Sequence, residues 1–214
     1  MYTSETNAFL AQLPLIQEKV VDILRSSPAD LVHAEVYLCM RVFLCRFASQ
    51  HLTGFWPIIL TEMVRILAQA KVDLPADKSD RLQLVFSVVK LADFLITLQT
   101  DDFQIHQWLF ITDTPDATNP ASFYMADSLL DCLAKFVSEC ERELVFDAND
   151  SLERAQQRRP LLQMSSVTTM STLQPFFATA SRAFYQCDFH APLDWDNINS
   201  CLLCDLFEPI RTNA

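Results

Sequence analysis

The sequence predicts an all-α protein, a stack of about seven or eight antiparallel helices without a sheet. Of its 214 residues, 50% are hydrophobic and 11% are aromatic, which is enough to bury a substantial core. Apolar residues recur at helical spacing along most of the chain. The chain has a single glycine, and because tight β-turns and dinucleotide-binding loops depend on glycine, an all-β or Rossmann-type fold is not expected.

The central element is a predicted helical hairpin over residues 36–67, in which two apolar helices flank a short break. The break contains Gly54 and Pro57, and Thr53 is expected to cap the second helix, because proline fits a first helical turn. Each helix carries only two charged residues within the hairpin, so both should be covered on more than one side. We therefore expect the hairpin to form the buried centre of the stack.

An amphipathic helix is predicted before the hairpin, over residues 5–25, and Pro14 should either start or kink it. The run Ser27–Asp30 then combines a capping serine, a proline and an acid. This run predicts the start of the first hairpin helix, which should continue to about Ala48.

The helix predicted over residues 79–99 has two apolar faces. We expect only Gln83, Ser87, Lys90 and Thr97 to face solvent. The helix should therefore lie between neighbouring helices. Such helices are typical of the inner layer of an α-solenoid. No repeat of fixed length is visible, so a HEAT-like stack would be a degenerate one.

The remaining chain alternates between helical and irregular segments, which together we expect to form one helical domain over residues 1–214. The predicted segments are a short helix over 101–111, a loop over 112–119, an amphipathic helix over 120–144, a mobile connector over 147–172, and helices over 173–187 and 195–208.

Composition limits the possible functions. The formal net charge of −11 repels nucleic acids and anionic lipid headgroups, and it suits basic protein partners. One glycine is too few for a phosphate-binding loop or a nucleophile elbow. No nucleophile and base stand at a recognisable spacing, so we expect no enzyme activity, no cofactor and no small-molecule substrate.

The seven cysteines and the hydropathy pattern bear on location. No secretory signal precedes the cysteines, which favours free thiols in a reducing compartment. No apolar run is long enough to span a bilayer. We therefore expect a cytoplasmic protein whose contact with membranes is indirect or peripheral.

Four residues near the end of the chain, Cys187, His190, Cys201 and Cys204, have a spacing like that of zinc ligands. The alternative is that they are ordinary core residues, because cysteines three positions apart on an amphipathic helix face the same side. We favour buried thiols and leave the zinc site open.

A tryptophan between two acids, Asp194-Trp195-Asp196, resembles the peptides that dock on kinesin light chains. Such a peptide must be extended and exposed to bind. In the alternative interpretation, Asp194 caps a helix, Asp196 favours its dipole and Trp195 packs on the core.

The one basic patch consists of Arg154, Arg158 and Arg159, which are candidates for contact with lipid headgroups. Lipid-binding clusters usually contain about four to eight basic residues, so a solvated helix turn is the interpretation we favour.

Three blocks of the sequence resemble the C-terminal region of the Dopey family, large cytoplasmic proteins of Golgi and endosomal membrane traffic. The blocks are Gln50–Glu62, Lys90–Leu95 and Phe103–Ile111, and they lie within residues 36–113, under half of the chain. None carries a catalytic signature. The residues that we expect to matter in them, for structural reasons, are Trp56, Pro57, Glu62, Asp93, Phe103 and Trp108.

The resemblance implies a scaffold or adaptor, associated peripherally with Golgi and endosome membranes, at the tail of a much larger polypeptide. The partners that it implies are a large Sec7-related scaffold and a phospholipid flippase. The alternatives are a peripheral lipid-surface module and a module that docks on kinesin light chains.

The last predicted helix, 194–207, presents more apolar surface than its neighbour 173–189 can cover. Exposed apolar patches of several hundred Å² mark interaction sites. We therefore expect the C-terminal third to carry a partner surface or to form a homo-oligomer.

Overall fold

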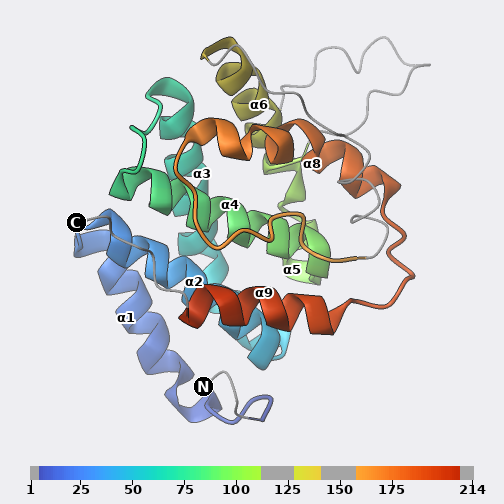
Figure 1. Ribbon diagram of the computed structural model, residues 1–214. Coiled ribbons are helices and arrows are strands. Elements are labelled where there is room, and N and C mark those ends of the chain that lie inside the picture. Colours follow the sequence, from blue (N-terminus) through green and yellow to red (C-terminus); the bar gives the residue numbers. More distant parts are fainter. Residues whose placement is uncertain (1–4, 112–127, 141–157, 208–214) are drawn as a thin grey trace.

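The computed structural model describes residues 5–111, 128–140 and 158–207. Within these ranges the chain forms eight α-helices and several 3₁₀ turns, and no strand (Figure 1). The all-α prediction is confirmed, whereas the solenoid arrangement stays a prediction. None of the helices in the described ranges is both long enough and apolar enough to cross a membrane.

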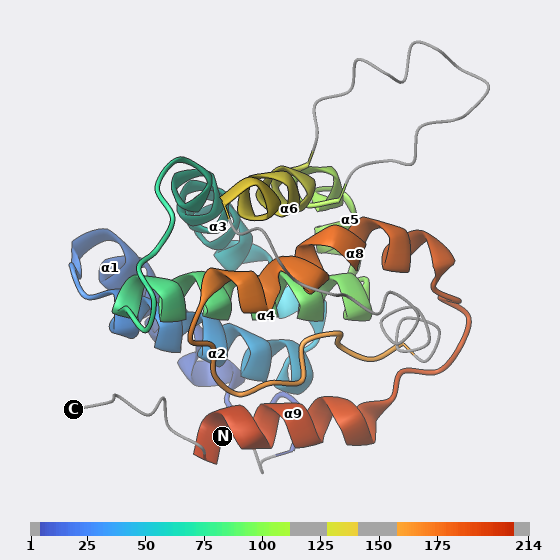
Figure 2. The same cartoon turned by 45° about the horizontal axis from the view of Figure 1, so that its top comes forward.

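Helix α4 (Asp80–Leu98) is the centre of the molecule, and every residue from Leu82 to Thr97 is buried. Ser79 caps it, because its hydroxyl oxygen accepts a hydrogen bond from the Leu82 amide at 3.1 Å. Helices α2 (Asp30–Arg46) and α3 (Trp56–Val72) pack against α4. In Figures 1 and 2, α8 (Gln174–Gln186) lies across one side of α4 and α9 (Trp195–Phe207) lies on the other.

The polar residues of α4 were expected to face water, and that expectation is wrong. Gln83, Ser87, Lys90 and Thr97 are all buried. A chain segment, 158–169, runs without helical structure along this side of α4 and covers it (Figure 1). The prediction failed because periodicity shows which residues share a face, but not what distant segment packs on that face.

The covering segment belongs to the predicted connector over 147–172, and its first part, 147–157, lies outside the described residues. Leu162 and Val167 are buried in the core. Their backbone groups are tied to α4, because Asp93 accepts a hydrogen bond from the Leu162 amide at 2.8 Å and Gln83 donates one to the Val167 carbonyl at 2.7 Å. Mobility of the connector stays a prediction, but its described part is anchored.

Two predicted helix caps are wrong, although both hairpin helices are present. Helix α2 begins at Asp30 after an extended Ala29, and the Ser27 hydroxyl only accepts a hydrogen bond from the Ala29 amide at 3.3 Å. Thr53 lies in a separate 3₁₀ turn, Thr53–Phe55, and α3 starts after it with a proline in its first turn. Extended residues separate Ser27 from its helix, and a 3₁₀ turn separates Thr53 from its helix.

Gly54 makes a close side-chain contact and has no positive backbone φ angle. The side chain of Gln17, on α1 (Leu13–Ser26), donates a hydrogen bond to the Gly54 carbonyl at 2.8 Å. A β-carbon at position 54 would lie 2.5 Å from the Gln17 Nε2 atom. A larger residue would therefore displace the flexible end of Gln17 and disturb this hydrogen bond between α1 and the hairpin turn.

The other elements follow the prediction in order, with shorter bounds. Pro14 lies in the first turn of α1, so the helix starts there, after a 3₁₀ turn at Leu10–Gln12. The remaining elements are α5 (Asp101–Gln104), the 3₁₀ turn Gln107–Leu109, α6 (Leu129–Cys140), the 3₁₀ turn Met170–Leu173, α8 and α9. The predicted loop 112–119 and the outer parts of the helix predicted over 120–144 lie outside the described residues.

Candidate functional site

An apolar groove of about 620 Å³ opens on the surface between the first half of α3 and the short segment that contains α5. Its apolar walls are Trp56, Pro57, Leu60, Val64, Ile105 and Leu109, and its polar residues are Thr53, Thr61, Asp102 and His106. The groove thus joins two segments that are about 50 residues apart in the sequence, and both belong to blocks that carry the Dopey resemblance.

Trp56 ties the two walls of the groove together. Its indole Nε1 donates a hydrogen bond to the Asp102 carboxylate at 3.1 Å, and its side chain is only 4% exposed. The placement follows from the local sequence: a proline directly after Trp56 fixes the start of α3, and Asp102 lies in the first turn of α5. A buried indole N–H needs such a partner.

The α5 segment packs on the core with one set of side chains and exposes another set to solvent. Phe103 and Phe110 are buried, and their stacked rings lie 6.0 Å apart between centroids. Between them, Ile105 is 70% exposed and Trp108 is 65% exposed. Large apolar side chains exposed beside an apolar groove are typical of an interaction site and not of a core.

A second, buried cluster lies between α2, α4 and α9. The Lys90 ammonium lies 2.6 Å from each oxygen of the Asp205 carboxylate and 2.7 Å from the Met164 carbonyl oxygen. Arg41 also donates to Asp205, and all three charged side chains are almost fully buried. Burial and the neighbouring Arg41 lower the pKa of Lys90, and Asp205 opposes that shift.

Asp93 is the fourth ionisable residue of this region and is 1% exposed. Burial raises its pKa to about 6, although the backbone amides of Leu162 and Leu161 favour the charged form. Perturbed pKa values in clefts are a signature of catalytic sites. Here, however, the three donors of Lys90 are all used by protein acceptors, so the cluster is built to hold α9 and the covering segment on α4.

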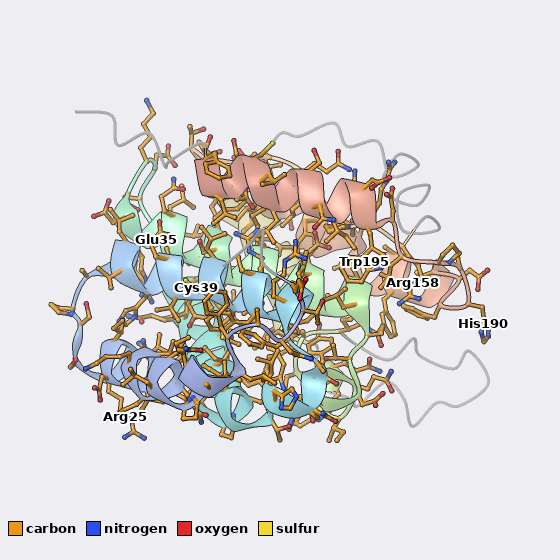
Figure 3. All side chains as sticks on the ribbon, turned by 90° about the horizontal axis from the view of Figure 1, so that it is seen from below. Arg25, Glu35, Cys39, Arg158, His190 and Trp195 are labelled. Atoms are coloured by element: carbon orange, nitrogen blue, oxygen red, sulfur yellow. The ribbon has the colours of Figure 1, made fainter. Side chains whose placement is uncertain are left out.

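The four residues with zinc-like spacing do not form a metal site. In the described part of the chain, no three His, Cys, Asp or Glu side chains are placed to hold a metal ion. Cys204 is exposed, while Cys187 and Cys201 are partly buried. The expectation of buried thiols is therefore wrong for Cys204, and Figure 3 shows His190 pointing away from the helices.

Asp194 caps α9, as expected, because its carboxylate accepts a hydrogen bond from the Asn197 amide at 3.0 Å. Trp195 is the first residue of the helix and is 44% exposed (Figure 3), and Asp196 lies in its first turn. The tryptophan is accessible, but it is helical, and docking on a kinesin light chain requires an extended segment.

Arg158 forms hydrogen bonds within the chain, and both interpretations of the basic patch stay predictions. Its guanidinium donates hydrogen bonds to the carbonyls of Thr97 and Leu98, at the end of α4, and to those of Phe189 and Ala191. It also lies 5.7 Å from the centre of the Phe189 ring. Arg159 is partly buried, and Arg154 lies outside the described residues.

The predicted structural residues fall into two groups. Trp56, Asp93 and Phe103 are buried, while Pro57 and Trp108 are exposed at or beside the groove. Glu62 accepts two hydrogen bonds from the Arg65 side chain, at 2.6 and 2.8 Å.

Sequence reasoning missed the groove, although a signal was present. Five residues of the segment 103–110 are large and apolar: Phe103, Ile105, Trp108, Leu109 and Phe110. In a segment this short, the five side chains cannot all point into the same core. It also missed the pairing of Asp205 with Arg41 and Lys90, for which the sequence offers no signal.

Comparisons with known proteins agree on one family. A family model described as DOP1 C-terminal matches residues 1–189. Protein DOP1B of Mus musculus is 27% identical over 219 residues, covering 86% of this chain and 10% of its own length. Protein pad-1 of Caenorhabditis elegans is 29% identical over 192 residues, covering 84% of this chain and 8% of its own length.

A fungal relative, protein dop1 of Emericella nidulans, is 32% identical over 130 residues, which cover 58% of this chain and 7% of that protein. The chain thus spans a tenth or less of the length of these curated relatives. No solved structure matches it.

Proposed function

This chain belongs to the DOP1 family, and from that premise we propose that it is a non-enzymatic scaffold or adaptor module in endosome–Golgi membrane traffic. The observation that supports the proposal is the groove between α3 and α5, with Ile105 and Trp108 exposed beside it. Its walls are mostly apolar, and such a surface fits a protein partner.

The proposed partners are a large Sec7-related scaffold and a phospholipid flippase, and the proposed location is the cytoplasmic face of Golgi and endosome membranes. Both come from the family. In this proposal the module reaches the membrane through other proteins. This agrees with the net charge of −11, because an acidic chain is repelled by anionic lipid headgroups.

The other functions have less support in the geometry. A kinesin-light-chain motif would need Trp195 in an extended segment, and a lipid-surface module would need free basic side chains where Arg158 instead holds backbone carbonyls. Self-association through α9 has some support, since Phe207 is 76% exposed and Leu203 is 37% exposed.

The cellular test deletes the region that encodes this chain and follows a fluorescent cargo that recycles from endosomes to the Golgi. We expect the cargo to accumulate in endosomes while the level of the remaining protein is unchanged. A normal cargo distribution at a normal protein level would contradict the proposed function.

The biochemical test mixes the purified chain with the Sec7-related scaffold or the flippase of the same organism and measures complex formation by analytical ultracentrifugation. The double variant Ile105→Ser with Trp108→Ser should lose the complex. Val72→Ser is the matched control, because Val72 is 83% exposed and is not part of the groove wall. Equal binding by both variants would exclude the groove as the docking surface.

A further inference from the structure

We propose that the groove between α3 and α5 takes one kind of ligand, an amphipathic helix of a partner protein whose apolar stripe is flanked by lysine or arginine. This inference rests on the proposed function and adds the chemistry of the partner. It is argued from hydrogen bonding, charge and apolar exposure at the groove.

Hydrogen bonding favours a helix over an extended peptide. Three donors in the wall are already used within the chain: Thr53 donates to the Gln50 carbonyl at 3.3 Å, Thr61 donates to the Pro57 carbonyl at 2.6 Å, and the Trp56 indole donates to Asp102. An extended peptide would leave its backbone groups without partners there. A helix satisfies its own backbone and needs only an apolar surface.

Charge at the groove favours a basic partner. Asp101 and Asp102 begin α5 at one wall, and neither forms an ion pair within the described residues. Among the ten residues that line the groove there is no lysine or arginine, and Arg65, the arginine that follows Val64 on α3, is paired with Glu62. Lysine or arginine beside the bound helix would therefore meet carboxylates, with no lysine or arginine of the groove lining to oppose them.

Apolar exposure supplies the anchors. Ile105 and Trp108 belong to a segment that is held against the core by the buried Phe103 and by the hydrogen bond from Trp56 to Asp102. A rigidly mounted tryptophan is among the residues that contribute most binding energy at interfaces. Because the mount is rigid, little side-chain or backbone ordering is required when a helix docks.

The direct experiment uses a fluorescein-labelled Leu/Lys amphipathic peptide of about 18 residues, or five helical turns, and measures anisotropy at physiological salt. Trp108→Ala should weaken its binding by about tenfold, as expected for an interface tryptophan. Trp195→Ala is the matched control, because it removes another exposed tryptophan, on α9, and should leave binding unchanged.

A second pair of variants tests position and charge. Thr61→Arg places a cation in the groove wall and should weaken binding at least as much as Trp108→Ala, whereas Gln12→Arg makes the same change in net charge at an exposed site outside the groove wall and should weaken it only slightly. Circular dichroism and melting temperature confirm that each variant is folded.

Two control peptides test the chemistry of the ligand. A Leu/Glu peptide of equal length should bind at least about tenfold more weakly than the Leu/Lys peptide, because the groove is flanked by carboxylates. A Leu/Lys peptide with a central proline, which cannot complete a helix, should also bind weakly.

Equal binding by Trp108→Ala, Thr61→Arg and their controls would show that the acidic chain only attracts cations in general, and would overturn the inference. Equal binding of the proline peptide would overturn the helical ligand. A third outcome separates the inference from the proposed function. If the Ile105/Trp108 double variant no longer binds the Sec7-related scaffold or the flippase, but the unmodified chain does not bind the Leu/Lys peptide, then the inference is overturned and the proposed function stands.

Discussion

Charged side chains are buried between α2, α4 and α9, whereas large apolar side chains face solvent between α3 and α5. Lys90 and Arg41 are 5% and 4% exposed, while Ile105 and Trp108 are 70% and 65% exposed. Each region thus reverses the usual distribution of polar and apolar residues.

The two reversals have different physical consequences. In the buried cluster, Lys90 and Arg41 meet their counter-charge, Asp205, inside the chain, so the cluster contributes to the arrangement of α9 and the covering segment. At the groove, Ile105 and Trp108 are largely exposed, so they contribute little to stability and are available for a partner. The comparison can be tested by substitutions in each region.

The largest effect is expected for Asp205→Ala, which leaves two buried cations without a counter-charge. Breaking a buried ion pair in this way costs about 3–5 kcal/mol, and the presence of two cations favours the upper end. For a chain of this size the melting temperature should fall by roughly 10 °C or more, measured by calorimetry. Asp196→Ala, an exposed acid on the same helix, is the control, and an equally small shift for both would contradict a structural role of the cluster.

Trp56→Ala should destabilise the chain by about 3–5 kcal/mol, because the buried ring leaves a cavity and Asp102 loses its hydrogen-bond donor. Urea denaturation measures the change. Trp56→Phe retains most of the ring and should cost less. A near-native melting temperature for Trp56→Ala would mean that the ring does not support the groove.

Asp93 should make stability depend on pH in an unusual direction. Its pKa is raised from 3.8 to about 6 in the folded chain, so the folded state retains a proton that the unfolded state loses. The contribution of Asp93 to stability therefore falls as pH rises from about 4 to 6 and stays low above that range.

Asp93→Asn isolates this contribution, because asparagine keeps an oxygen to accept the Leu162 amide. The free energy of unfolding of the native chain, minus that of the variant, should fall by about 2 kcal/mol between pH 4 and pH 7. A difference that stays constant over this range would show that Asp93 does not titrate there.

The smallest effect on stability is expected for Trp108→Ala. The ring is 65% exposed, so its removal should change the free energy of unfolding by no more than about 0.5 kcal/mol. The contrast with Trp56→Ala, at the same groove, separates a residue that builds the site from one that faces the partner. A loss of several kcal/mol would place Trp108 in the core instead.

The sequence was sufficient for the fold class and for most helices. Helical periodicity and the scarcity of glycine predicted the all-α architecture, and both hairpin helices, α4, α8 and α9 lie where that periodicity placed them. These are local properties, because neighbours three and four positions apart decide whether a segment forms an amphipathic helix.

Helix boundaries were less predictable. Ser27 and Thr53 have the chemistry of capping residues, but Ser27 is followed by extended residues and Thr53 lies in a separate 3₁₀ turn before its helix starts. A capping side chain competes with other local hydrogen bonds, such as that from Thr53 to the Gln50 carbonyl, and the sequence does not show which of them forms.

Only the tertiary structure decided which surfaces are open. The sequence placed Lys90 on a polar strip of α4, which suggested a solvent-exposed lysine, and it did not indicate whether Trp108 is buried. In the fold Lys90 is buried, because Asp205, 115 residues away, pairs with it, and no described segment covers Trp108. Burial depends on contacts between segments far apart in the chain, and such contacts leave no periodic signal in the sequence.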